Sequence, residues 1–514
     1  MNNRPKITKL SYVSLLLSGV ALGLSFPKAG LWPLAWVSIV PLLIFLLETG
    51  RVDAFKGGLV YGLAYFITTI YWVEHSIRIY GHLPIYLSIP SLLLLCLVLA
   101  LYVSLFSILF NNLYMTTRFP ALLLAPVLWV SLDLLRTYLF TGFPWASIGY
   151  SQYKWLSIIQ IADITGVYGV SFLVVAVNGA FADIILYRRR MQIFPLFPVF
   201  PTLLGIVLVF MGILGAVWYG YFRLNQKDGY ASKLTVSVVQ GNIDQSGKWN
   251  TDNRQSIMAV YKQLTRLTLQ KSPDLVVWPE TSVPFVFNND PEPTEKLRSF
   301  VRSISTPLLF GSVEILSSKE TTYELSNAAV LLDADGRTAG TYEKIHLVPF
   351  GEYIPWMLPL EKLVTAIGNF SPGKTYTVMK AYKVPFSTVI CYEIIFPELV
   401  RKFINKGAKF LVTITNDAWF GKTSAPYQHF SMAVFRAVEN RVPVVRSANT
   451  GISGFIDDRG HIIRMGRLFR EETLTETISI SNGSKSFYTK FGNVFGYLCV
   501  VAGVMIIIFK GETK

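Results

Sequence analysis

The 514-residue chain contains the stretch Val389-Ile390-Cys391-Tyr392-Glu393-Ile394-Ile395-Phe396-Pro397. The apolar residues before the cysteine predict a short strand over Ser387–Ile390. In open α/β sheets, ligand sites form beyond the carboxyl ends of such strands. The stretch therefore predicts an α/β fold in which Cys391 stands at a candidate site.

Cys391 differs in its setting from the other two cysteines of the chain. Cys96 and Cys499 lie in long apolar runs, and we expect both to be buried in lipid and unreactive. The region around Cys391 offers no second cysteine for a disulfide and no Cys/His spacing typical of a metal site. We therefore expect no metal or cofactor, and a thiol with a chemical role.

Two further polar residues stand at or near strand ends. Glu280 closes the run LVVWPE at 275–280, and Lys344 lies in GTYEKIHLVPFGE at 340–352. A partly buried glutamate can take the proton of a thiol, and a nearby ammonium favours the thiolate and stabilises an oxyanion. Taken singly, each residue also fits an ordinary role as a turn carboxylate, a surface charge or an inert core thiol. Together they indicate acyl transfer through a thioester.

The motifs VVWPE, YEKIHLVPFGEYIP, VICYEIIFPE and TNDAWFG, in this order, resemble the carbon–nitrogen hydrolase (nitrilase) superfamily. Apolar segments before and after them make the chain similar to the apolipoprotein N-acyltransferase family. TGFPWASIGYSQ at 141–152 and VVQGNIDQ at 238–245, followed by Lys248-Trp249, extend this resemblance.

The resemblance implies a set of site residues. It makes Glu280 the general base, Lys344 the oxyanion-stabilising residue and Cys391 the nucleophile. The supporting or substrate-binding residues that it implies are Trp249, near the substrate entrance, and Glu352, Tyr392 and Glu393.

The resemblance also implies the fold, the substrates and a lid. The fold is an α-β-β-α sandwich, and the lid corresponds to about 350–372, with apolar surface from Phe350, Tyr353, Trp356, Met357 and Phe370. The acyl donor is a membrane phospholipid, phosphatidylethanolamine in this family, and the acceptor is a diacylated apolipoprotein. We expect a monomer that binds no nucleic acid.

Composition indicates a membrane protein with a water-soluble part. Hydrophobic residues make up 52% of the chain and charged residues 15%, against about 25% in soluble domains. Apolar segments near the spanning length of about 20 residues lie at 10–26, 31–48, 57–74, 85–111, 120–140, 162–187, 197–222 and 491–509. We expect a multi-pass α-helical membrane domain of about eight transmembrane helices.

Basic residues predict the orientation of these spans. Arg4, Lys56, Arg118, the triplet Arg188–Arg190 and Lys510 fall on one side when eight helices alternate. Arg78 and Arg136 lie near the outer ends, and the Arg triplet decides the orientation. Both termini are then cytoplasmic and the segment 224–490 is extracytoplasmic, in the periplasm of a bacterium by the resemblance. The net charge of +15 fits cytoplasmic flanks and anionic lipid headgroups rather than nucleic acid.

The predicted domains are 1–223 with seven transmembrane helices, 224–488 as the nitrilase-like catalytic domain and 489–514 as a C-terminal transmembrane helix. Apolar strands alternate with helices in the catalytic domain, which favours a covered α/β sheet. The strands are predicted at Leu234–Gln240, Asp274–Trp278, Leu308–Val313, Ala328–Leu332, Ser387–Ile390, Phe410–Thr415 and Val442–Ser447. The helices are predicted at Asp252–Leu269, Pro291–Ser303 and Tyr427–Glu439. Gly336 marks a hairpin turn.

Several residues keep two interpretations. His346 and His429 are alternative bases for the thiol, or side chains that satisfy hydrogen bonds. Asp133 and Arg136, at i and i+3, form either a functional intramembrane pair or a structural one. Asn416-Asp417 is either a turn or part of the active-site wall. Trp145 is either an interfacial anchor or part of a substrate portal.

Two other functions remain possible from the residues. A membrane-anchored amidase or nitrilase shares the same three residues, although seven preceding spans exceed what an anchor needs. A transporter with an ectodomain is the second alternative, and it lacks the inverted repeats and paired broken helices of that class.

Overall fold

The computed structural model describes residues 8–117, 119–191, 199–226, 229–319, 322–354 and 370–509. The chain divides into two compact units. The first unit, called the helical unit below, comprises residues 1–74, 84–226 and 491–514. The second, called the catalytic unit, comprises residues 75–83 and 227–490.

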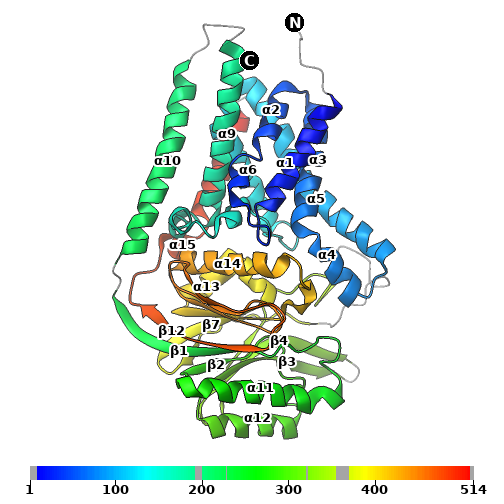
Figure 1. Ribbon diagram of the computed structural model, residues 1–514, viewed down its shortest axis with the longest axis vertical. Helices are drawn as coiled ribbons and strands as arrows, with labels where there is room; N and C mark the ends of the chain where they lie inside the picture. The colour runs from blue at the N-terminus through cyan, green and yellow to red at the C-terminus, as the bar shows by residue number, and fades with distance from the viewer. Residues whose placement is uncertain are drawn as a thin grey trace. The chain divides into compact units, whose positions relative to one another are not determined.

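The helical unit consists of apolar helices, and Figure 1 shows α9 and α10 running side by side within it. The main helices are α1 (Lys9–Leu24), α2 (Val40–Glu48), α3 (Arg51–Ile70), α5 (Ile85–Thr117), α6 (Ala121–Tyr138), α9 (Val167–Met191), α10 (Val199–Asn225) and α16 (Val494–Phe509). Shorter helical segments are η1 (Trp32–Trp36), η3 (Ile148–Gln152), α7 (Leu156–Ile159) and α8 (Ala162–Thr165), and α4 (Trp72–His75) ends at the catalytic unit.

Four helices of the described chain are long and apolar enough to cross a membrane: Ile85–Thr117, Ala121–Tyr138, Val167–Leu186 and Leu203–Asn225. Shorter apolar helices lie at Lys9–Leu24, Trp32–Glu48, Leu156–Thr165 and Val494–Phe509. The structure therefore supports a membrane domain with four candidate spans, and the count of eight stays a prediction.

The intramembrane charges form a buried structural pair. Arg136 and Asp133 are 2.8 Å apart and almost fully buried in α6. The Arg136 guanidinium also donates to the carbonyl oxygens of Phe143, at 3.0 Å, and Trp145, at 2.5 Å. The pair thus fixes the loop after α6. Trp145 is fully buried and packs on Trp72 at 4.7 Å, so its interpretation as an interfacial anchor is wrong.

The catalytic unit is built on two six-stranded sheets. The first has the order β12-β1-β2-β3-β4-β5 and the second β11-β10-β9-β8-β7-β6. The strands of the first are β1 (Tyr230–Gln240), β2 (Leu275–Val277), β3 (Leu308–Lys319), β4 (Thr322–Leu332), β5 (Thr338–Glu343) and β12 (Glu472–Ser481). Those of the second are β6 (Met379–Ala381), β7 (Val384–Ile390), β8 (Phe410–Thr415), β9 (Val444–Ala448), β10 (Gly454–Ile456) and β11 (Ile462–Met465).

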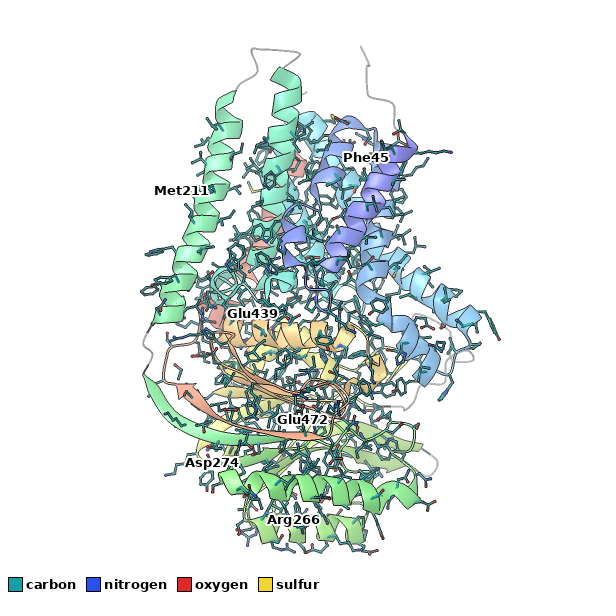
Figure 2. The ribbon with its side chains drawn as sticks, in the orientation of Figure 1. Phe45, Met211, Arg266, Asp274, Glu439 and Glu472 are labelled. Atoms are coloured by element: carbon teal, nitrogen blue, oxygen red, sulfur yellow. The ribbon has the colours of Figure 1, made fainter. Side chains whose placement is uncertain are left out.

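Helices cover the outer face of each sheet (Figure 1). The apolar faces of α11 (Arg254–Thr268) and α12 (Pro291–Ile304) share a buried core with β1 to β4, which includes Tyr261, Trp278 and Phe300. The second sheet is covered by α13 (Pro397–Asn405) and α14 (Ala425–Asn440). Figure 2 labels Arg266 on α11 and Glu439 on α14, in the two helical layers. The predicted α-β-β-α sandwich is confirmed.

Parallel pairing brings several strand ends together. β1, β2 and β3 are parallel in the first sheet, as are β7, β8 and β9 in the second. The segments that follow β2, β7 and β8 therefore leave the sheets at the carboxyl ends of neighbouring strands. Glu280, Cys391 and Asn416 lie in these segments. The predicted hairpin turn at Gly336 joins β4 to β5, with a φ of 75° at this residue.

Candidate active site

Glu280 lies on the turn after β2 and is 6% exposed. Its two carboxylate oxygens have separate donors: the Asn327 side-chain amide donates to Oε1 at 2.8 Å, and the Asn416 main-chain N–H donates to Oε2 at 2.9 Å. Asn327 comes from β4 and Asn416 follows β8. The two sheets together therefore fix the direction of the carboxylate.

Lys344 follows β5 and is 1% exposed. Its Nζ lies 2.8 Å from Glu352 Oε1 and 3.9 Å from Glu280 Oε1. Burial opposes the charge of the ammonium, but the fields of Glu352 and then Glu280 exceed that effect and raise the pKa of Lys344. The two carboxylates therefore favour the charged form of Lys344.

Glu352 connects this ammonium to the loop that carries it. Its Oε1 accepts from Lys344 and also from Asn327 Nδ2 at 3.0 Å, while its Oε2 accepts from the main-chain N–H of Val348 at 2.8 Å. A carboxylate with this many charged and neutral donors is held in one rotamer. Glu352 therefore positions Lys344 against Glu280.

Cys391 follows β7 directly and opens the short helix η6 (Cys391–Ile395). Its φ is 53°, a left-handed value that is uncommon outside glycine and is found at functional turns. The residue is 7% exposed. Burial, followed by the charge of Glu280, raises the pKa of the thiol, and Lys344 acts in the opposite direction. The thiol thus lies in the electrostatic field of both other predicted catalytic residues.

Glu393 supports the main chain around the thiol. This fully buried carboxylate accepts hydrogen bonds at Oε1 from the Tyr342 hydroxyl at 2.7 Å and from the N–H groups of Ile345 and His346 at 2.8 and 3.0 Å. Its Oε2 accepts from the N–H of Ile390 at 2.8 Å. Burial raises its pKa, and these N–H donors oppose that effect. Glu393 therefore joins the Lys344 loop to the strand that ends at Cys391.

Tyr392 and Trp249 take different positions. Tyr392 is 9% exposed and its ring lies 5.2 Å from that of Phe396 and 6.0 Å from that of His346. Trp249 is 48% exposed, in the loop before η4 (Thr251–Asn253). The Tyr392 ring thus packs among the aromatic rings of Phe396 and His346, and Trp249 lies on the surface of the catalytic unit.

The two histidines contact main chain and aromatic rings. His429 Nε2 lies 3.1 Å from the carbonyl oxygen of Cys391, and its Nδ1 faces Asp417 at 3.1 Å and Arg446 at 2.9 Å. His346 stacks on Phe396 at 3.8 Å. His429 therefore contacts the main chain of Cys391, as the hydrogen-bonding interpretation predicts, and the assignment of Glu280 as the base of the thiol is a proposal.

Asn416 and Asp417 form part of the site wall, as one of the two interpretations predicted. Asn416 donates to Glu280 through its N–H and to Gln245 through its side chain, at 2.5 Å. Asp417 is fully buried and pairs with Arg446 at 2.8 Å. Burial is opposed by Arg446 and His429, and the net effect lowers the pKa of Asp417.

Sequence reasoning missed Asn327 and the role of Lys248. Asn327 lies within β4, directly before its apolar run at 328–332. A polar residue next to such a run marks a candidate position, but the sequence does not show which group it contacts. Lys248 is fully buried beside Glu280. Among the described residues, no group of three or more His, Cys, Asp or Glu side chains is arranged to hold a metal ion.

The predicted lid lies largely outside the described residues, which omit 355–369 and so Trp356 and Met357. Of its described part, Phe350 is 39% exposed and its N–H donates to the Tyr353 carbonyl at 2.7 Å. Phe370 follows the gap, and its N–H donates to the Glu352 carbonyl at 3.1 Å. Glu352, which positions Lys344, therefore lies in the described part of the predicted lid and accepts a hydrogen bond from Phe370.

Comparisons with known proteins give the class to which each part of the chain belongs. A carbon–nitrogen hydrolase family model matches residues 235–485, and an apolipoprotein N-acyltransferase N-terminal domain model matches residues 18–180. The solved structure of Saccharomyces cerevisiae Nit3, a nitrilase-superfamily protein, aligns with 49% of this chain and 91% of its own at 19% identity, with a TM-score of 0.39. The family model thus defines residues 235–485 as a carbon–nitrogen hydrolase domain.

Full-length relatives narrow the class further. The apolipoprotein N-acyltransferase of Geobacter metallireducens is 43% identical over 99% of this chain and 96% of its own length. Those of Photobacterium profundum and Pasteurella multocida are 33% and 31% identical over 94% and 95% of this chain, and over 93% of their own lengths. The chain belongs to the apolipoprotein N-acyltransferase family.

Proposed function

We propose that this protein transfers a fatty acyl group from a membrane phospholipid to the α-amine of the N-terminal diacylglyceryl-cysteine of an apolipoprotein, through a thioester on Cys391. The name carried by its full-length relatives supports the reaction. We further propose phosphatidylethanolamine as donor, a monomeric enzyme, and a catalytic domain on the periplasmic side of the bacterial inner membrane.

The first half-reaction acylates the enzyme. Glu280 takes the proton of the Cys391 thiol, and the sulfur forms a bond to the carbonyl carbon of the donor ester. Lys344 stabilises the resulting oxyanion, a contribution of about 3–4 kcal/mol for one well-placed donor. The ester C–O bond then breaks, Glu280 returns the proton to the leaving oxygen, and a lysophospholipid departs.

The second half-reaction uses the same groups. The α-amine of the acceptor attacks the thioester carbonyl, and Glu280 takes the amine proton. The C–S bond breaks, the amide is released and the thiol is protonated again. This sequence is ping-pong catalysis with one acyl-enzyme intermediate.

One observation carries this proposal: Lys344 Nζ lies 3.9 Å from Glu280 Oε1, and the charges of both groups act on the buried thiol of Cys391. A thiol that is protonated at neutral pH needs a base before it can attack an ester. The orientation of the two Glu280 carboxylate oxygens by Asn327 and Asn416 supports that role for Glu280. Lys344 supplies the charge that balances an oxyanion.

A product assay tests the function. The purified protein is incubated with phosphatidylethanolamine vesicles and a synthetic diacylated lipopeptide, and the peptide mass is recorded with time. We expect a gain of one acyl group with the wild type, and no gain with Cys391→Ala. A wild type that releases free fatty acid or ammonia and leaves the peptide mass unchanged would instead identify an amidase or esterase.

A second variant tests the role of the base. Glu280→Gln keeps the shape of the side chain and one of its two acceptor oxygens but cannot take a proton. We expect the rate of acylation to fall by at least about 100-fold, within the usual range for general-base catalysis. Acylation at the wild-type rate would assign the base to another residue.

A further inference from the structure

Lys248 is a buried lysine beside the base that the proposed reaction does not use. It is 0% exposed, and its Nζ donates to the Glu280 carbonyl oxygen at 3.3 Å and to the Thr281 hydroxyl at 3.0 Å. Both acceptors are neutral. Removing an ammonium from water costs free energy that such acceptors offset only in part. A lysine side chain buried at this cost therefore requires a functional explanation.

The turn that Lys248 contacts is strained. Thr281, a β-branched residue, has a φ of 44°, which is unfavourable for its side chain. The turn also packs directly on Gly311, where a Cβ atom would lie 2.4 Å from the Thr281 nitrogen and 2.6 Å from the Glu280 Cα. Backbone of this kind persists only where neighbouring groups over-determine it.

The loop that carries Lys248 restrains Glu280 a second time. Gln245, in the same loop, accepts from the Asn416 side chain at 2.5 Å, and the Asn416 N–H donates to Glu280 Oε2 at 2.9 Å. Lys248 thus fixes the main chain of Glu280, and Gln245 acts on its carboxylate through Asn416. Trp249 stands next to Lys248 and is 48% exposed.

We propose that Lys248 is a positioning residue, which holds the strained Glu280–Thr281 turn so that the carboxylate faces the thiol. The inference rests on the proposed function, because it assigns Lys248 to the same base. The adjacent residues face opposite ways, one into the turn and one to the surface.

The charge of Lys248 supplies a specific signature. Burial, opposed by the field of Glu280, lowers the pKa of Lys248 to about 8. Among the described residues, Glu280 is the charged group whose field raises the pKa of Lys248 against the effect of burial. The ammonium form donates stronger hydrogen bonds than the neutral amine. Lys248 therefore restrains the Glu280–Thr281 turn most strongly below about pH 8, where it is charged, and more weakly as the pH rises through that value.

The test is the rate of thioester formation with phosphatidylethanolamine vesicles alone, followed by intact-protein mass spectrometry. Lys248→Met should slow this step by about 10- to 100-fold, because small misplacements of a catalytic group have effects of that size. The apparent KM for phospholipid should stay within about twofold. Lys262→Met, at a partly buried lysine on α11, is the matched control and should react like the wild type.

The pH dependence separates positioning from a structural role. The ratio of wild-type to Lys248→Met rates should be largest at pH 7 and fall between pH 8 and 9.5, as the wild-type lysine loses its charge.

Thr281→Val keeps Lys248 and the side-chain volume and removes one acceptor. It gives a second measurement should Lys248→Met fail to fold, and at pH 7 it should slow the step by about tenfold or more, the effect of one hydrogen bond from a charged donor.

Two results would overturn the inference while leaving the proposed function intact. One is a Lys248→Met protein, or in its place Thr281→Val, that forms the thioester at the wild-type rate. The other is a rate loss that is the same at every pH and accompanies a lower Tm, which is the mark of a merely structural residue. A wild type that forms no thioester would contradict the proposed function, and this inference with it.

Discussion

At the scale of single residues, the chemistry of Cys391 follows from its burial. Burial and the charge of Glu280 raise the pKa of the thiol, so it remains largely protonated in mildly alkaline buffer. We expect alkylation of Cys391 by iodoacetamide to accelerate by about tenfold per pH unit from pH 7 to 10 without a plateau. Peptide mass spectrometry measures the rate, with Cys391→Ala as the blank. A plateau below pH 8 would indicate a lowered pKa instead.

Lys344 offers a second prediction at this scale. Lys344→Met would leave the carboxylates of Glu280 and Glu352 buried without their counter-ion, which typically costs about 3–5 kcal/mol of the free energy of unfolding. Adding Glu352→Gln should restore part of the loss. Thermal unfolding in detergent measures both variants. Lys296→Met removes an exposed pair with Glu292 and should leave Tm unchanged.

Sequence reasoning reached Glu280 and Cys391 because each follows a recognisable apolar strand, and it reached Lys344 through the motif that resembles the family. It did not reach Asn327 or the function of the Asn416 N–H, since their partner Glu280 lies 47 and 136 residues away in the chain. Hydrogen bonds across two sheets depend on how the strands are ordered. No local pattern around Asn327 contains that order.

At the scale of elements, a buried charge cluster links β9, η7 (Asp417–Phe420) and α14 to the nucleophile. Arg446 on β9 pairs with Asp417 at 2.8 Å and contacts His429 of α14, which in turn meets the carbonyl oxygen of Cys391. All three side chains are fully buried. The cluster therefore braces the strained residue at which the thiol is presented.

Arg446→Met tests this bracing. The change leaves Asp417 as a buried charge without its main partner, so we expect a loss of about 3–5 kcal/mol in the free energy of unfolding and slower thioester formation. Arg464→Met is the matched control, because its ion pair with Glu476 on the sheet edge is partly exposed and worth about 0–1 kcal/mol. Equal Tm values for the two variants would contradict the bracing role.

The seven predicted strands and three predicted helices are confirmed, with ends displaced by a few residues and β3 and β4 extended well beyond prediction. The unpredicted strands are β5, β6, β10, β11 and β12. Of these, β11 is exposed at all four residues and β5 at three of six, so their sequences lack the apolar run that marks a buried strand. Tertiary pairing, rather than local pattern, makes them strands.

At the scale of the whole molecule, the catalytic unit is not one continuous segment of chain. Residues 75–83, between helices of the membrane part, belong to it. The Ser76 hydroxyl donates to the Trp419 carbonyl at 2.7 Å, and the Tyr80 hydroxyl donates to the Ala418 carbonyl at 2.9 Å. The Tyr80 and Trp419 rings lie 4.6 Å apart. This segment thus supports the loop that contains Asn416.

Tyr80 variants measure that support. Tyr80→Phe removes one hydrogen bond, worth about 1 kcal/mol, and Tyr80→Ala also removes a ring contact worth about 0.5–1.5 kcal/mol. If this energy holds the Asn416 loop in place, thioester formation should fall about fivefold in the first and about 10- to 50-fold in the second. Steady-state rates with one vesicle preparation compare them. Wild-type rates in both would show that the segment is dispensable.

The architecture at this scale was predictable because composition separates the apolar helices from the α/β part, and because the motifs resemble a known family. The contribution of residues 75–83 was not predictable, since a short polar segment between two apolar helices looks like any connecting loop. The orientation in the membrane and the count of eight spans remain predictions.

The most direct test of the central claim is the mass of the intact protein after incubation with phosphatidylethanolamine and no acceptor. We expect the wild type to gain one acyl chain on Cys391, to lose it on treatment with hydroxylamine, and to pass it to a diacylated lipopeptide added later. Cys391→Ala should gain nothing. An acyl adduct on any other residue, or lipopeptide acylation by the Cys391→Ala protein, would contradict the account.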